Sequence, residues 1–174
     1  IDARPGAGGA LGTEIAARSA PDGYTLLMAS AATLCITPAL YPKIPYNTLK
    51  DFAPVSTVAG VSYVEVVHPG VAAKSLQDFI ALAKSKPRQL RYGSAGSGSV
   101  THLAVELFRS MAGIELMHVP YKVIGQTTAD LLSGQVTMSF QTALSAIPYL
   151  KSSKLHVLAV AAHKALTSSR VVVP

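Results

Sequence analysis

Residues 92–103 read Tyr-Gly-Ser-Ala-Gly-Ser-Gly-Ser-Val-Thr-His-Leu, a glycine- and serine-rich stretch between two regular elements. A short β-rich run over 90–93 leads into it. The apolar spacing after it predicts a helix over 100–111. A strand that passes through such a loop into a helix is typical of α/β proteins, so the fold class expected for this chain is α/β.

This loop also has the chemistry of an anion site. Glycine lets the backbone approach a ligand closely, serine and threonine add hydroxyl donors, and the unpaired N–H groups at a helix start favour negative charge. The alternative is an ordinary turn with Ser99 as the helix cap. The candidate ligand-binding residues here are Ser94, Gly96, Ser97, Gly98, Ser99 and Thr101.

The rest of the chain alternates short β-rich runs with helical stretches, which favours mainly parallel sheets flanked by helices. Strands are expected over 24–29, 55–60, 61–67, 90–93, 115–120, 136–140 and 155–161. Helices are expected up to about residue 17 and over 36–40, 75–86, 100–111, 126–133 and 143–151. The pattern suggests one lobe over 1–70 and another over 71–160, with 61–67 and 155–161 as crossover strands. A single doubly wound domain fits it almost as well.

Two further loops also follow predicted strands, as the glycine-rich loop does. Ser30 and Thr33 come after the 24–29 run, and Gln141 comes after the 136–140 run. Since ligands of α/β sheets collect at the carboxyl ends of strands, all three are candidate ligand-binding residues. A plain connection for the first loop and a helix cap for Gln141 remain alternatives.

Composition and charge argue against nucleic acid as a partner and against a membrane-spanning segment. The chain has 174 residues, of which 49% are apolar and 14% charged, and its net charge is +6. Lys and Arg are spread out without an aromatic platform, so nucleic-acid binding is not expected. No apolar run reaches the ~18 residues of a membrane span.

Enzyme motifs are missing when checked one by one. The loop has no glycine two residues before a serine in the nucleophile-elbow pattern, and Thr101 stands where a dinucleotide fingerprint needs its third glycine. The five histidines lack metal-binding spacing, and no carboxylate pair suggests acid–base work. The prediction is therefore no catalytic residue, no metal and no cofactor. His102 is expected to bond a backbone carbonyl, and Cys35 to be a buried, inert thiol.

Several longer motifs follow one another along the chain: Arg4-Pro5-Gly6-Ala7-Gly8-Gly9, Ala20-Pro21-Asp22-Gly23-Tyr24, Asp51-Phe52-Ala53-Pro54-Val55, Gly96-Ser97-Gly98-Ser99 with His102-Leu103, Val119-Pro120-Tyr121-Lys122 and Asp130-Leu131-Leu132-Ser133-Gly134-Gln135-Val136. In this order they resemble the tripartite tricarboxylate transporter receptor family, the Bug-type solute receptors. The resemblance runs from about residue 3 to residue 161.

This resemblance implies a type II periplasmic-binding-protein fold of two lobes that close around a small organic carboxylate. It further implies a monomeric periplasmic receptor that delivers its ligand to the membrane permease subunits of a transporter. In the family pattern the loop over 96–101 grips a ligand carboxylate, and Ser30 and Thr33 match the opposing loop. Against that pattern the chain is expected to be truncated at both ends, with 161–174 returning toward the first lobe.

Three departures from the family pattern bear on the ligand. Val123 and Ile124 stand where glycine and a small residue are usual, Thr137 replaces an aspartate, and Gln141-Thr142 replaces Asp-Asn. The lost acidic residues disfavour a ligand with an ammonium group. Two alternatives stay open at this point: a sensory module that signals to a partner protein, and an α/β enzyme without a recognisable motif.

Overall fold

The computed structural model describes residues 1–4, 9–122 and 124–161. These residues form two compact units, one of residues 1–58 with 98–100 and the other of residues 59–97 with 101 onward. Of the sequence features above, residues 5–8, Val123 and the part of the return segment over 162–174 lie outside the described residues.

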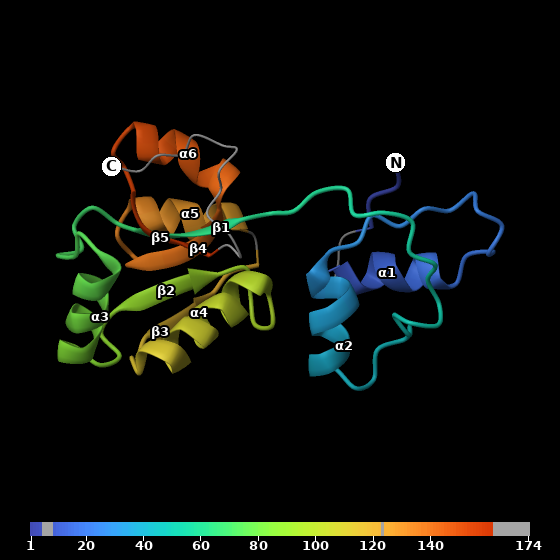
Figure 1. The fold of residues 1–174 in the computed structure, drawn as a ribbon, viewed down its shortest axis with the longest axis horizontal. Helices are drawn as coiled ribbons and strands as arrows, with labels where there is room; N and C mark the ends of the chain where they lie inside the picture. The colour runs from blue at the N-terminus through green and yellow to red at the C-terminus, as the bar shows by residue number, and fades with distance from the viewer. Residues whose placement is uncertain (5–8, 123, 162–174) are drawn as a thin grey trace. The chain divides into compact units, whose positions relative to one another are not determined.

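The second unit is built on one five-stranded sheet with the order β3-β2-β4-β1-β5 (Figure 1). The strands are β1 (Tyr63–Val67), β2 (Arg91–Ser94), β3 (Met117–Pro120), β4 (Met138–Thr142) and β5 (His156–Ala161). β2 is parallel to β3 and β4, whereas β1 is antiparallel to both β4 and β5. The α/β class is confirmed, and the sheet is mixed because β1 runs against the other four strands, which share one direction. Hydrophobic runs reveal burial of a strand and not its direction.

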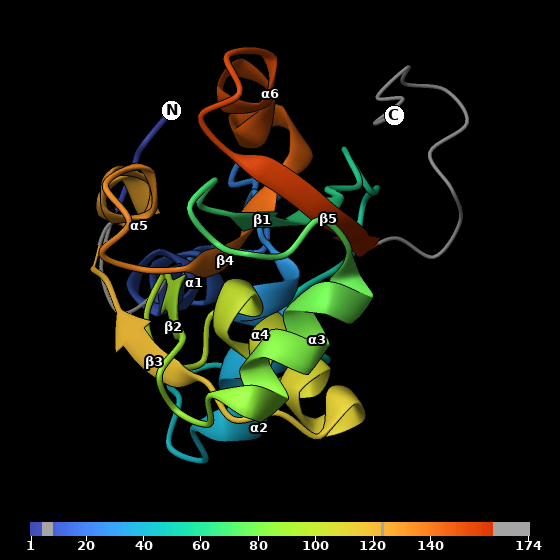
Figure 2. The ribbon, with the colours of Figure 1, turned by 90° about the vertical axis from the view of Figure 1, so that its left-hand side faces the viewer.

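Helices cover both faces of this sheet (Figure 2). α3 (Leu76–Ser85) and α4 (Val100–Ala112) cover one face, and α5 (Ile124–Leu132) and α6 (Ala143–Lys151) cover the other. Successive side chains of β1 point to opposite faces of the sheet and so contribute to both hydrophobic cores. Val66 packs toward α5 and α6, while Val67 packs toward α3 and α4. Each fully buried side chain of this size contributes about 1.5–3 kcal/mol, so both layers stabilise the sheet.

Most predicted elements of the second unit are confirmed within one or two residues, because their start and stop signals are local. Ser75 caps α3 by accepting a hydrogen bond from the Asp78 N–H at 3.1 Å, and α3 ends two residues before Pro87. The fourth strand lies two residues later than predicted, over Met138–Thr142. None of the helices that the structure describes is long and apolar enough to cross a membrane.

The first unit holds α1 (Ala10–Ala17), a π-helical turn η2 (Ala32–Ile36) and α2 (Thr37–Leu40). The second helical stretch therefore begins before the predicted residue 36. Tyr46 fixes it, because the tyrosine is buried and its hydroxyl donates to the Thr33 carbonyl at 2.5 Å. Thr48 adds a second bond, from its hydroxyl to the Leu34 carbonyl at 2.8 Å.

Two predicted strands of the first half are wrong. Residues 24–29 and 55–60 have no strand structure, and the alternate side chains of Tyr24, Leu26 and Met28 are 93%, 79% and 81% exposed. A strand needs a neighbour that takes up its N–H and C=O groups. Within the described part of the chain no segment pairs with either run, so an apolar composition alone does not make them strands.

Candidate functional site

The glycine-rich loop lies where the sequence places it, between the end of β2 and the start of α4. β2 occupies an inner position between β3 and β4 and runs parallel to both. The carboxyl ends of these three strands consequently share one edge of the sheet, the edge at which α/β proteins bind ligands. Gln141 of β4 lies at this edge as well.

Two of the predicted ligand-binding residues, Ser94 and Thr101, accept hydrogen bonds from the backbone of the loop itself. Ser94 is fully buried, and its Oγ accepts a hydrogen bond from the Gly96 N–H at 3.2 Å. Thr101 is also buried, and its Oγ1 accepts from the Ala95 N–H at 3.0 Å. Gly96 and Gly98 have φ angles of +99° and +78°, which glycine adopts without strain.

The other loop positions are closer to solvent. Ser97 is exposed, while Gly96, Gly98 and Ser99 are half-buried. Since Ser94 and Thr101 are turned inward, the ligand contacts expected of this loop fall to Ser97, Gly96, Gly98 and Ser99, beside the exposed Ala95. These ligand contacts remain predictions.

The backbone carbonyl of Ser94 is also hydrogen-bonded. Its oxygen accepts hydrogen bonds from the Tyr121 N–H at 3.0 Å and the Thr127 hydroxyl at 3.4 Å. Tyr121 is anchored in turn by its hydroxyl, which donates to Asp130 at 2.6 Å, and burial together with that carboxylate raises the pKa of Tyr121 to about 12. A Cβ at Gly93 would lie 2.5 Å from Thr127 Cγ2, so only glycine permits this close packing.

Beneath the loop lies an aromatic stack that the sequence analysis missed. The His118 ring stacks between Tyr92 and His102, with ring centroids 4.7 and 4.3 Å away, and His118 Nε2 is 2.7 Å from Ser94 Oγ. His102 also lies 3.9 Å from Glu106, one helical turn away on α4. His118 belongs to β3, and no local signal connects residues 94, 102 and 118.

Glu106 is the carboxylate next to this stack, and it interacts with both Tyr92 and Arg109. It accepts a hydrogen bond from the Tyr92 hydroxyl and forms an ion pair with Arg109 at 2.6 and 2.8 Å. Burial tends to raise the pKa of Glu106, but the bonds from Tyr92 and Arg109 outweigh it and leave that pKa below its ordinary value. Burial, and then the charge of His102, lower the pKa of His118.

Gln141 is 2% exposed and faces α5. Its Nε2 donates to the Thr128 hydroxyl at 3.2 Å, and its Oε1 has no hydrogen-bond partner among the described residues. The side chain is therefore positioned by α5 at the edge where the loop begins. Its role toward a ligand stays a prediction.

Ser30 and Thr33 lie together in the first unit, where Thr33 is buried and Ser30 exposed. The Thr33 hydroxyl donates to the Ser30 carbonyl at 3.0 Å, and the Ser30 N–H donates to that hydroxyl at 3.3 Å. The Thr33 hydroxyl thus makes both of these bonds to the backbone of Ser30, three residues earlier. Ser30 is the member of the pair whose side chain is open to solvent, and a ligand contact there is still a prediction.

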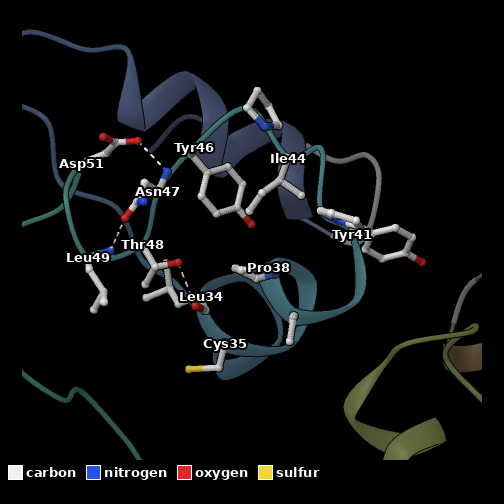
Figure 3. A pocket seen from close by; sticks show the side chains of 13 residues that line it. Leu34, Cys35, Pro38, Tyr41, Ile44, Tyr46, Asn47, Thr48, Leu49 and Asp51 are labelled. Carbon is white, nitrogen blue, oxygen red and sulfur yellow. Dashed lines mark hydrogen bonds between the residues drawn. The ribbon is translucent and has the colours of Figure 1, made fainter.

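A pocket of about 930 Å³ opens in the first unit, and it contains no predicted ligand-binding residue (Figure 3). Its lining includes Cys35, which is exposed, so the expected burial of this thiol is wrong. The Asp51 carboxylate accepts the Asn47 N–H at 2.6 Å on the same wall, which disfavours an anion there. The described residues hold no group of His, Cys, Asp and Glu suited to a metal ion.

An α/β unit with a braced glycine-rich loop at the carboxyl edge of its sheet has the construction of a protein that binds a small ligand. The sequence profile described as "Tripartite tricarboxylate transporter family receptor" matches residues 1–172. The chain belongs to this family, which is one of periplasmic binding proteins and not of enzymes.

Individual relatives agree with this assignment. Protein BugT of Bordetella pertussis is 38% identical over 161 residues, which is 92% of this chain and 49% of BugT. An R. palustris protein solved with adipate is 32% identical with a TM-score of 0.85, over 94% of this chain and 55% of that protein. MatC from Rhodopseudomonas palustris, solved with bound malate, is 30% identical with a TM-score of 0.78, over 91% of this chain and 54% of MatC. The chain spans about half the length of the relatives it matches.

Proposed function

We propose that this chain is part of a periplasmic receptor that captures a small organic carboxylate and delivers it to the membrane permease subunits of a tripartite tricarboxylate-type transporter. The single observation that supports it best is the loop after β2, which has positive φ at Gly96 and Gly98 and in which Ser94 and Thr101 accept the N–H groups of Gly96 and Ala95. Backbone N–H groups held in place bind an anion without a cost of ordering at the moment of binding. Two relatives were solved with dicarboxylates, adipate and malate.

The ligand in this proposal lacks an ammonium group. Glu106 and Asp130, the carboxylates that brace this site, already interact with Arg109 and Tyr121. Gln141 is neutral, so a ligand ammonium would find no free carboxylate among these residues. The net charge of +6 supports attraction of an anion over longer distances. The proposal also retains two expectations from the sequence, a second lobe that closes on the ligand and further donors from Ser30 and Thr33.

A thermal-shift screen against citrate, malate, adipate, glutamate, nicotinate, benzoate and terephthalate tests this proposal. A ligand at about a hundred times its Kd adds about 2.7 kcal/mol to the stability of the folded state. We expect a rise in Tm with one class of carboxylate and none with glutamate. No shift with any of these acids, from protein that is folded by circular dichroism, would contradict the proposal.

A matched pair of glycine variants locates the site. Gly96→Ala and Gly113→Ala both place a side chain at positive φ, and neither Cβ would meet an atom closer than 3.5 Å. Each should cost about 1 kcal/mol of stability through strain. Only Gly96→Ala adds a methyl group to the proposed carboxylate loop, so we expect it to weaken binding at least tenfold in calorimetric titrations. Equal affinities for the two variants would remove the loop from the site.

A further inference from the structure

The hydroxyl group of Ser94 stands between two possible acceptors. Its Oγ lies 2.7 Å from His118 Nε2 and 3.3 Å from the Gly96 carbonyl oxygen, and it already accepts the Gly96 N–H at 3.2 Å. A hydroxyl has one hydrogen to donate. It can therefore bond His118 or the Gly96 carbonyl, and not both at full strength.

The hydrogen on His118 Nε2 decides between these two arrangements. In the neutral tautomer that carries its hydrogen on Nδ1, Nε2 is an acceptor and the Ser94 hydroxyl donates to it, whereas in the Nε2–H tautomer Nε2 is already a donor. In an imidazolium both ring nitrogens are donors, so Nε2 donates to Ser94 and the hydroxyl hydrogen turns toward the Gly96 carbonyl. The Ser94 hydroxyl then accepts a hydrogen bond from the Gly96 N–H and donates one to the Gly96 carbonyl. Both bonds stabilise the left-handed turn at Gly96.

The charges around His118 make this equilibrium sensitive to an added anion. His118 is packed against Tyr92 of β2 and His102 of α4, with Glu106 and Arg109 of α4 next to them. The ion pair of Glu106 with Arg109 carries no net charge, and burial together with the nearby charge of His102 lowers the pKa of His118. A carboxylate at the loop would supply the missing negative charge.

We propose that His118, whose neutral ring carries its hydrogen on Nδ1, is a positioning residue for the carboxylate loop, and that the Ser94 hydroxyl couples proton uptake by His118 to anion binding at the Gly96 turn. This inference rests on the proposed function of the loop. Coupling of this kind is reciprocal: bound carboxylate favours the imidazolium, and the imidazolium favours bound carboxylate. The receptor should bind its ligand more tightly in mildly acidic surroundings than at alkaline pH.

Calorimetric titration with malate, or with adipate if the stability screen favours it, tests the coupling between about pH 6 and pH 8. Both carboxyl groups of these ligands are ionised in that range, so the ligand itself contributes little. We expect the Kd to rise by roughly fivefold or more with pH. Titrations in buffers of different ionisation enthalpy should show net proton uptake on binding.

Three variants separate positioning from simple structure. His118→Gln keeps a donor toward Ser94 without a titratable ring, so it should bind malate with neither pH dependence nor proton uptake. His118→Leu removes the bond to Ser94 and should bind more weakly at every pH. His156→Gln changes an exposed histidine of β5 and should behave as the wild type.

The outcomes separate a failure of this inference from a failure of the proposed receptor function. Malate binding without proton uptake in the wild type, or unchanged uptake in His118→Gln, would overturn the inference and leave the receptor function intact. Absence of binding by every carboxylate would overturn the function. The hydroxyl switch would then still be tested by nuclear magnetic resonance, because the Gly96 amide signal must follow a titration that His118→Gln abolishes, and its failure to do so would overturn the switch.

Discussion

Glu65 lies in the middle of β1, where its side chain is 1% exposed and neither carboxylate oxygen has a hydrogen-bond partner among the described residues. Its neighbours across the sheet are Phe140 on β4 and Ala159 on β5. A charged carboxylate in such surroundings is expensive, and the group responds by holding its proton. Burial accordingly raises the pKa of Glu65 from 4.5 to about 7.

This shift predicts a stability that falls as the pH rises. Below about pH 4.5 Glu65 is protonated in both the folded and the unfolded chain. Between about pH 4.5 and 7 only the folded chain keeps the proton, so the free energy of unfolding decreases, and above pH 7 the loss is complete. The difference amounts to about 3 kcal/mol at most.

Glu65→Gln removes this titration. The amide is as poorly partnered as the acid, but that cost does not vary with pH. We therefore expect the variant to gain stability relative to the wild type by up to about 3 kcal/mol from pH 5 to pH 8 in urea denaturation. Glu115→Gln, at an exposed glutamate, should show a flat difference. A flat difference for both variants would mean that Glu65 titrates normally.

Among the secondary-structure elements, α3 shows most directly how local sequence chemistry sets a helix boundary. Ser75 accepts the Asp78 N–H, while Asp78 Oδ2 accepts the Lys74 N–H at 3.2 Å, which together form a reciprocal cap. The Ser75 bond satisfies an N–H group that the first helical turn leaves without a partner, and the Asp78 bond fixes the residue before the cap. The same residues predicted the cap from the sequence.

Ser75→Ala should destabilise the second unit by about 1 kcal/mol, seen as a lower urea midpoint with an unchanged slope. Ser85→Ala serves as the control at the other end of α3, where the serine hydroxyl donates to the Leu82 carbonyl at 2.8 Å. Alanine is a better helix former than serine, so this change should be neutral or slightly stabilising. Equal losses for the two variants would contradict the capping role.

For the whole molecule, backbone pairing divides the chain into protected and unprotected parts. In the second unit, β1 is paired on both sides and β2 lies between β3 and β4. Residues 24–29 and 53–60 have no strand partner among the described residues, and several of their large apolar side chains are exposed. Amides exchange slowly only where hydrogen bonds and burial must be broken first.

Hydrogen exchange read by mass spectrometry should reproduce this division. We expect peptides covering β1, β2 and β4 to exchange at least a hundredfold more slowly than peptides covering 24–29 and 53–60, which corresponds to about 3 kcal/mol or more of local stability. Strong protection over 24–29 in the isolated chain would show that this run is paired in solution.

What the sequence determined by itself is local. The strand–loop–helix unit around residues 92–103, the cap at Ser75 and most helices follow from periodicity, glycine and proline, because the groups that decide them lie within a few residues of one another. The family followed from ordered motifs along the chain. The nine candidate ligand-binding residues came from the same loops and motifs, and their contacts with a ligand remain predictions.

What only the tertiary structure decided is long-range. The direction of β1, the stack of Tyr92, His102 and His118 under Ser94, and the isolation of Glu65 each depend on segments brought together from distant parts of the chain. The failed strands over 24–29 and 55–60 have the same cause. A run of apolar residues records what a segment can bury, whereas a strand forms only where another segment supplies the partners for its backbone.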